Sequence, residues 1–209
     1  MIPLEIQLTF FLASVLLALA PGPDNIFVLT QSALYGRSSG LAVVFGLCTG
    51  IIVHTSAVAL GVAVLFKTSA IAFSILKFIG AGYLAFLAWQ AFQASPDEIN
   101  GSSTISLSPW KLYRRGIIMN VTNPKVSIFF LAFLPQFADP MRGPVSLQIL
   151  YLGGLFIVST IWVFGAIAVL AGSLGEWLRK SPRTQIIFNR LAGTVFLALA
   201  LKLATTTRL

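Results

Sequence analysis

One acidic and one basic residue lie inside apolar stretches of this sequence, each directly after a proline. Asp24 follows Pro23 in the first apolar stretch, and Lys125 follows Pro124 about a hundred residues later. A charge in the interior of a bilayer is costly, and where one occurs it generally marks a substrate or ion path. A carboxylate binds ammonium groups and a lysine binds carboxylates, so this pair suits a small zwitterion.

The prolines that precede these charges should interrupt their helices and release backbone carbonyls. The predicted helix breaks are at Pro21, Pro23 and Pro124. Proline lacks the N–H that would bond the carbonyl four residues earlier, so Pro21 frees the carbonyl of Leu17 and Pro124 frees that of Asn120. Unpaired backbone at membrane depth is tolerated only where protein or a water-filled cavity covers it. We therefore expect the two breaks to face each other inside the protein.

The residues around the two breaks form the predicted substrate site. A helix that restarts at Pro23 points its N–H groups and positive dipole end into the first break, which suits a carboxylate, as does Lys125. The freed carbonyls and Asp24 suit an ammonium group. A structural ion pair between Asp24 and Lys125 would explain the same two charges. The predicted substrate-binding residues are Gly22, Pro23, Asp24, Asn25, Asn120, Asn123 and Lys125.

Two side chains could carry a proton at membrane depth, Asp24 and His54. His54 is the only histidine in the chain, and imidazole titrates in a range that suits a proton relay. A lone buried histidine is more often a neutral, hydrogen-bonded packing residue, so both interpretations stay open. The only cysteine, Cys48, permits neither an internal disulfide nor a cysteine-based metal site. We predict no metal site and no cofactor.

The composition indicates that lipid covers most of the protein surface. The chain is 57% hydrophobic and 10% charged, with a mean hydropathy of +0.91, whereas about 25% of the residues of a soluble domain are charged. The net charge of +8 comes from basic residues that flank the apolar stretches. We therefore expect these residues to set membrane topology rather than to bind nucleic acid.

We predict an all-α, multi-pass membrane protein with six transmembrane helices, of which the first and fourth are broken. The apolar stretches are long and do not alternate, so they do not resemble the strands of a membrane barrel. About 20 apolar residues cross a bilayer core of ~30 Å as a helix. The expected spans are residues 4–34, 40–66, 70–92, 116–137, 145–174 and 185–204.

A polar, serine-rich connection divides these spans into two halves. Residues 95–115 are predicted to be a linker between a first three-helix repeat, residues 1–94, and a second, residues 116–209. Lysine and arginine are slightly more frequent after the first, third and fifth spans than after the others. Under the positive-inside rule this bias places both termini outside.

The two halves share a weak internal repeat. Residues 77–85 match residues 190–198 at an offset of 113, Pro23 matches Pro124 at 101, and Gly46 matches Gly153 at 107. Since each half has an odd number of spans, the second copy must enter the membrane from the opposite face. Many secondary transporters have such an inverted-topology repeat, and their substrate sites lie at interrupted helices in corresponding positions of the two halves.

At these motifs the chain resembles a known family. Pro-Gly-Pro-Asp-Asn at residues 21–25 is similar to the signature of the lysine exporter/threonine efflux family of bacterial inner-membrane proteins. The length near 200, the six hydrophobic segments, Gly-Ala-Gly-Tyr-Leu at residues 80–84 and Asn-Pro-Lys at residues 123–125 also resemble that family. The matching motif positions are Pro21, Gly22, Pro23, Asp24, Asn123, Pro124 and Lys125.

The resemblance implies an exporter of amino acids or close derivatives across the bacterial inner membrane. It also implies coupling to the proton gradient, without a nucleotide-hydrolysing subunit. The expected partners are then a small zwitterionic substrate and the lipid bilayer, with no nucleic acid. Short loops and faces of small residues would suit a homodimer.

Two other functions fit the sequence less well. A divalent-cation exporter would need several oxygen ligands, or soft histidine and cysteine ligands, and the spans offer one deep acid, one histidine and one cysteine. An intramembrane enzyme would need a catalytic constellation. The sequence has no His-Glu-x-x-His, Gly-x-Ser-x-Gly or Cys-x-x-Cys motif and no paired intramembrane aspartates. We therefore predict a transporter and no enzymatic activity.

Overall fold

The computed structural model describes residues 2–68, 70–94, 107–180 and 182–205, and these residues form helices and no strand. The prediction of an all-helical fold is confirmed for this part of the chain. The α-helices are α1 (Leu4–Leu19), α2 (Pro23–Tyr35), α3 (Arg37–Thr68), α4 (Ala70–Gln93), α5 (Pro109–Val121), α6 (Pro124–Ile128), α7 (Val145–Lys180) and α8 (Pro182–Thr205). A π-helical turn, Phe129–Phe133, and the 3₁₀ turns Leu134–Phe137 and Pro140–Arg142 follow α6.

Both expected helix breaks are present, and both end at a proline. The chain bends by 64° between α1 and α2, and by 51° between α5 and the segment that starts with α6. Pro23 and Pro124 occupy the first turn of α2 and α6, where the missing N–H costs no hydrogen bond. Gly22 before Pro23 is extended, with φ −172° and ψ 174°. The breaks thus follow from local proline chemistry, as predicted.

The structure supports the membrane prediction at a coarser level than six spans. By length and apolar composition, Arg37–Gly61 of α3 and Val145–Ala171 of α7 can each cross a membrane. Each bent pair also qualifies when it is counted as one span, so the described residues contain two to four candidate spans. Helices α4 and α8, the predicted third and sixth spans, are not among these candidates.

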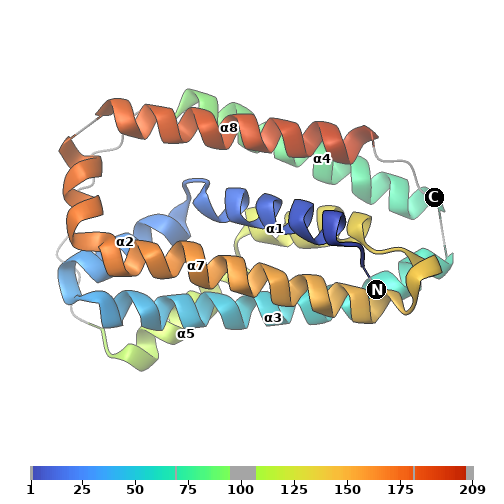
Figure 1. Ribbon diagram of the computed structural model, residues 1–209, viewed down its shortest axis with the longest axis horizontal. Helices are drawn as coiled ribbons and strands as arrows, with labels where there is room; N and C mark the ends of the chain where they lie inside the picture. Colours follow the sequence, from blue (N-terminus) through green and yellow to red (C-terminus); the bar gives the residue numbers. More distant parts are fainter. Residues whose placement is uncertain (1, 69, 95–106, 181, 206–209) are drawn as a thin grey trace.

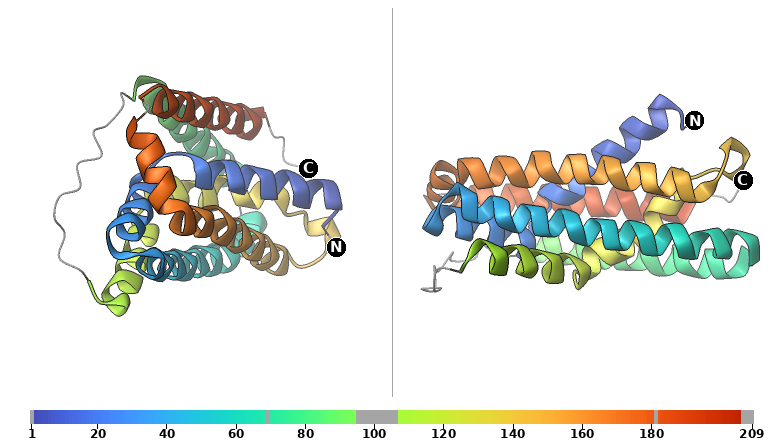
Figure 2. Two further views of the ribbon diagram at one scale, coloured as in Figure 1. Left: turned by 60° about the vertical axis from the view of Figure 1, so that its left-hand side comes forward. Right: turned by 90° about the horizontal axis from the view of Figure 1, so that it is seen from below.

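The helices lie roughly along one long axis (Figure 1). Helices α3 and α7 pack against each other, α5 packs on α3, and α1 and α2 pack on α7. Helices α4 and α8 form a further pair (Figures 1 and 2). In these views α1, α4 and α7 run in one direction, and α3, α5 and α8 run in the opposite one. Consequently α1 begins and α8 ends at the same end of the bundle (Figure 1).

Helix α5 begins earlier than the predicted fourth span. It starts at Pro109, inside the range 95–115 that was predicted as a linker, while residues 95–106 lie outside the described residues. Proline is favourable at the first position of a helix, where its fixed φ fits and its missing N–H is not needed. Residues 109–115 include Lys111, Arg114 and Arg115. These charges lower the mean hydropathy of the stretch, and for this reason hydropathy places the start of the span at residue 116.

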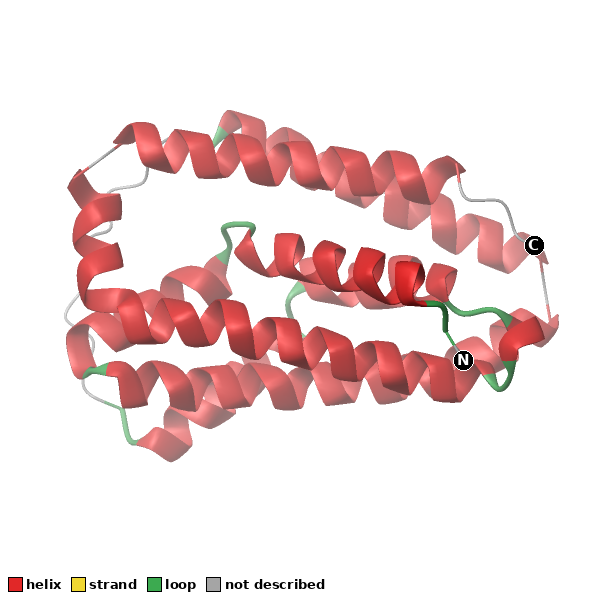
Figure 3. Cartoon of the chain, in the orientation of Figure 1, coloured by secondary structure: helices red, strands yellow, loops and turns green. Residues whose placement is uncertain are grey.

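The described segments are helices joined by short connections (Figure 3). A cluster of phenylalanines lies on and around the π-helical turn. Its rings lie 4.8–6.2 Å apart between centroids, and its members are at most 7% exposed. Large apolar side chains on the outside are well exposed, among them Leu60 (77%) and Trp162 (71%), as lipid contact requires. The aromatic cluster consists of Phe10, Phe129, Phe130, Phe133, Phe137 and Phe156.

The backbones of α3 and α5 touch at two glycines. A Cβ added at Gly46 would lie 2.1 Å from the carbonyl oxygen of Tyr113, and one added at Gly116 would lie 2.4 Å from that of Val43. Backbone cannot yield as a flexible side chain can. Small residues at such crossings let membrane helices approach closely.

We therefore expect Gly46→Ala to lower the stability of the folded protein by about 1–3 kcal/mol, the usual cost of overpacking. Thermal unfolding of the purified protein in detergent measures this effect. Gly82→Ala in α4 is the matched control, because a Cβ there meets nothing within 4 Å. An equal effect of the two substitutions would contradict the direct contact between the α3 and α5 backbones.

Candidate functional site at the two helix breaks

A hydrogen bond joins the two breaks directly. Asp24, in the first turn of α2, is 3% exposed, and its Oδ2 accepts a hydrogen bond of 2.8 Å from Nδ2 of Asn123. Asn123 caps α6, since its Oδ1 accepts from the backbone N–H of Lys125 at 3.0 Å. The capping bond turns the amide group of Asn123 so that its N–H₂ faces Asp24. One asparagine thus starts α6 and orients the buried carboxylate of α2.

Lys125 binds the C-terminal end of α1. Its side chain is buried, and its Nζ donates to the carbonyls of Leu17, at 3.3 Å, and Ala20, at 3.0 Å. The carbonyl of Leu17 is the one that Pro21 frees. A helix C-terminus is also the negative end of the helix dipole, so these carbonyls form a small cradle for a cation. The ammonium group of Lys125 fills that cradle.

The two buried charges are not in contact. No ion pair within 4.0 Å joins Asp24 and Lys125, whereas Arg142 and Asp139 do form one, at 3.0 Å. The alternative of a direct ion pair between Asp24 and Lys125 is therefore wrong for this structure. Asp24 binds an amide instead, and Lys125 binds backbone. Both charges consequently remain able to interact with something else.

Gly22 and Asn25 complete the first break. A Cβ added at Gly22 would lie 3.3 Å from Nζ of Lys125 and 3.8 Å from Oδ1 of Asn25, so glycine leaves room for the lysine head group. Asn25 donates from Nδ2 to the carbonyl of Ala18 at 2.7 Å and thereby ties α2 to the end of α1. Pro23 is exposed. Its structural role in the break is to occupy the first position of α2.

In the second break the freed carbonyl of Asn120 is satisfied. It accepts from the backbone N–H of Asn123 at 3.1 Å, and Nε2 of His54 lies 3.2 Å from it. The imidazole ring of His54 also stacks on Phe130, with 5.6 Å between ring centroids. The structure thus places His54 beside the second break, where it contacts backbone. Its part in proton transfer stays a prediction.

Three oxygen atoms at the breaks are buried and accept no hydrogen bond. They are Oδ1 of Asp24, Oδ1 of Asn25 and Oδ1 of Asn120. A buried acceptor without a partner costs free energy, and such groups in native proteins call for an explanation. All three accept and none donates, which fits a ligand group rich in N–H. The described residues of the site therefore suit an ammonium group.

The sequence missed some groups that the structure places in or near the site. The carbonyls of Ala18 and Ala20 bind Asn25 and Lys125, and the only sequence signal for them was their position at the end of an interrupted helix. Elsewhere on α2 and α7, Gln31, Ser32 and Thr160 are buried polar residues with an unpartnered oxygen each. Gln31 lies seven residues after Asp24, on the same face of α2, and this spacing could have identified it.

Comparison with known proteins places this arrangement in a family. Residues 15–207 match the family described as LysE type translocator. The homoserine/homoserine lactone efflux proteins of Salmonella typhi and Salmonella typhimurium are each 35% identical over 196 residues, 94% of either chain. A membrane protein of Vibrio cholerae is 34% identical over 203 residues, 97% of this chain and 98% of its own. No solved structure matches the chain.

These matches cover nearly the whole chain and include both helix breaks. They confirm the resemblance that the Pro-Gly-Pro-Asp-Asn and Asn-Pro-Lys motifs indicated. They also agree with apolar helices that can cross a membrane and with a translocator rather than an enzyme. The chain is a multi-pass membrane protein that belongs to the LysE type translocator family.

Proposed function

We propose that this protein exports homoserine, or an amino-acid derivative close to it, across the bacterial inner membrane in exchange for protons. The observation that carries the proposal is the meeting of the two breaks. There a buried carboxylate and a buried ammonium group lie close to unpartnered oxygen acceptors without neutralising each other directly. Intramembrane charges of this kind mark a transport path.

The packing of the helices supports an inverted 3+3 repeat. Helices α1–α2, α3 and α4 would correspond to α5–α6, α7 and α8, and members of each pair run in opposite directions (Figure 1). The two middle helices pack on each other, as do α4 and α8, and each broken helix packs on the middle helix of the other half. A pseudo-two-fold axis between the halves accounts for all three contacts.

Two glycine pairs test this correspondence. Gly80 and Gly193, at an offset of 113, agree with it in part: a Cβ at Gly80 would meet Ala132 of the π-helical turn first and Leu203 of α8 next, and one at Gly193 would meet Phe92 of α4. Gly46 and Gly153 do not agree, because Gly46 approaches α5 whereas Gly153 approaches Thr55 of α3. The repeat is therefore supported by the prolines and the outer helix pair rather than by the middle glycines.

The contacts assign a part of the substrate to each charge. An ammonium group has three N–H donors, so a substrate ammonium can bind the free Oδ1 atoms of Asp24 and Asn25. Two of the three donors of Lys125 bind the carbonyls of Leu17 and Ala20. The third donor can bind a carbonyl or carboxylate oxygen of the substrate. Homoserine and its lactone both present an ammonium group and a carbonyl oxygen, and the relatives in Salmonella are named for exporting both.

Competition for one carboxylate can couple export to protons. Asp24 cannot bind a substrate ammonium and carry a proton at the same time, since each neutralises the same oxygen atoms. Exclusive binding of substrate and proton is what an exchanger requires. His54 contacts the carbonyl of Asn120 and makes no hydrogen bond to Asp24 or Lys125. We therefore assign the exchanged proton to Asp24.

The homodimer that the sequence suggested remains a prediction.

The proposal is tested by uptake into inverted membrane vesicles. With an imposed proton gradient, we expect vesicles that contain the protein to accumulate radiolabelled L-homoserine, and the accumulation to stop when a protonophore collapses the gradient. L-homoserine lactone should inhibit this uptake with comparable potency, because it keeps both recognised groups.

N-acetyl-L-homoserine is the matched control for the ammonium group. It should inhibit uptake about tenfold less well or worse, since it lacks the charged donor that the buried acceptors need. Equal inhibition by the acetylated compound would contradict the assignment of Asp24. An absence of gradient-driven uptake of L-homoserine, in vesicles that contain folded protein, would refute the proposed function.

A further inference from the structure

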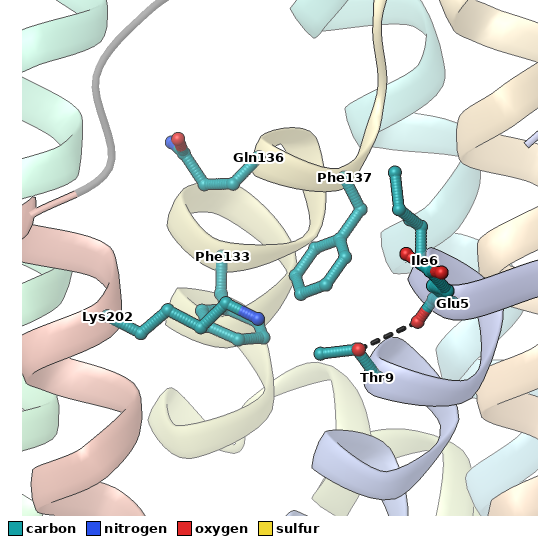
Figure 4. A pocket seen from close by; sticks show the side chains of 7 residues that line it. All are labelled: Glu5, Ile6, Thr9, Phe133, Gln136, Phe137 and Lys202. Atoms are coloured by element: carbon teal, nitrogen blue, oxygen red, sulfur yellow. Dashed lines mark hydrogen bonds between the residues drawn. The ribbon is translucent and has the colours of Figure 1, made fainter. Parts of the chain in front are cut away.

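A pocket lies at the end of the bundle where α1 begins and α8 ends, away from the helix breaks (Figures 1 and 4). It has a volume of about 320 Å³. Glu5 is in the first turn of α1, and Lys202 is in the last turn of α8. The pocket is lined by Glu5, Thr9, Phe133, Gln136, Phe137 and Lys202, among others.

The two charged residues lie on opposite sides of the pocket in Figure 4, with Phe133 and Phe137 between them. Nζ of Lys202 lies 5.0 Å from the centroid of the Phe137 ring, a cation–π contact that directs it over the aromatic wall. Thr9 and Gln136 add a hydroxyl and an amide. A volume of about 320 Å³ is at the lower end of the ~300–1,000 Å³ typical of small-molecule pockets. The pocket therefore suits a small molecule with both charges.

We propose that this pocket is a second binding site for the transported zwitterion, in which Glu5 binds the ammonium group and Lys202 the carboxylate. The proposal rests on the proposed export function and adds a second substrate-binding site to the transport path. The pocket lies at one end of the bundle, so it would hold the substrate on its way between the breaks and the aqueous phase at that face.

The aromatic cluster separates this pocket from the helix breaks. Phe137 lines the pocket and also contacts Phe10 edge-on, with 5.2 Å between ring centroids, and Phe133 at 5.0 Å. Phe10 is fully buried. Along α1, Glu5 is twelve residues from Leu17, or ~18 Å at 1.5 Å per residue. One small molecule cannot reach both places, so the pocket and the breaks are distinct sites.

Substrate protection of a cysteine in the pocket wall tests the proposal. Full-length protein with Cys48→Ala and Gln136→Cys is placed in phosphatidylglycerol nanodiscs, after its transport has been verified, and is labelled with a small maleimide. At about ten times its Kd, L-homoserine should slow labelling about tenfold, because about a tenth of the pockets stay free. Met141→Cys at the same end is 92% exposed and should label at an unchanged rate.

Charge variants identify the groups that bind. Glu5→Gln and Lys202→Gln should each raise the L-homoserine concentration needed for protection about fivefold or more, since each removes one charge-assisted contact. The control Lys111→Gln, an exposed lysine of α5 outside the pocket, should leave protection unchanged. Unchanged protection in both pocket variants would overturn the proposal.

Asp24→Asn separates the pocket from the breaks. Protection of the cysteine should persist in this variant, even when transport is lost. If protection disappears with Asp24→Asn, the cysteine merely reports occupancy of the breaks and the proposal falls. If wild-type protein transports L-homoserine but the cysteine is never protected, the pocket alone is refuted. A lack of transport by the wild type refutes the proposed function instead.

A phosphatidylethanolamine headgroup has the same pair of charges as a free amino acid. Nanodiscs that contain this lipid distinguish the two sources. Labelling of the cysteine at residue 136 should not depend on the lipid, and protection by L-homoserine should persist. Slow labelling in phosphatidylethanolamine without any amino acid, combined with loss of protection, would identify a lipid site and overturn the proposal.

Discussion

Asp24→Asn is expected to reduce proton-driven uptake of L-homoserine about thirtyfold or more, while the protein still folds. The substituted amide keeps the shape of the side chain and can still accept the hydrogen bond that Nδ2 of Asn123 donates to Asp24. What it loses is the charge that would bind the substrate ammonium and the exchanged proton. Removal of one partner of a buried charge pair costs about 2–5 kcal/mol of binding, and 1.4 kcal/mol is a factor of ten.

The control for this variant is Asp139→Asn. Asp139 lies in the connection before α7 and pairs with Arg142, away from the breaks, so uptake should stay near the wild-type rate. Immunoblotting and thermal unfolding establish equal amounts of folded protein. Wild-type uptake by the Asp24→Asn variant would remove Asp24 from the site and from proton coupling.

Lys125→Met is expected to abolish uptake and, in addition, to destabilise the folded protein by about 3 kcal/mol. Methionine keeps much of the apolar stem but donates no hydrogen bond. The carbonyls of Leu17 and Ala20 then lose their partner, and hydrogen bonds to a charged group are worth about 1.5–3 kcal/mol each. The buried carboxylate of Asp24 also loses a nearby positive charge. Thermal unfolding in detergent and uptake into inverted vesicles measure the two effects.

Lys77→Met in α4 is the control, since Lys77 lies over the ring of Phe78, outside the breaks. The double variant Asp24→Asn/Lys125→Met separates electrostatics from backbone support. Removal of both charges should destabilise less than the sum of the single changes, because each single change leaves one charge uncompensated. Strict additivity would indicate that the two residues do not interact and would contradict a shared site.

Much of the fold could be predicted from the sequence, because it follows from the covalent chemistry of neighbouring residues. The breaks at Pro21–Pro23 and at Pro124 follow from a missing N–H and a fixed φ, which act within four residues. Continuous apolar runs predicted helices in lipid, and the described residues form helices with short connections and no strand. The start of α5 at Pro109 was missed, because its first turns carry charged residues and hydropathy does not report on a helix that precedes the membrane.

The sequence also predicted which residue types form the site. An acid and a base beside two breaks had to be covered by protein, and the structure places Asp24 and Asn123 in contact across 99 positions. The alternative explanation, a direct ion pair between Asp24 and Lys125, is not what the structure shows, however. Both backbone and carboxylate can bind a lysine, and which one is closer depends on how the end of α1 packs beside α6.

The sequence by itself determined where the helices break, that the surface lies in lipid, and which family the chain belongs to, since these depend on neighbouring residues and on motifs. Tertiary structure alone decided that Lys125 binds the end of α1, that Asn123 orients Asp24, and that Glu5 and Lys202 share a pocket. Those contacts join residues about a hundred or more positions apart. No local pattern encodes them, because they arise only when separate helices pack.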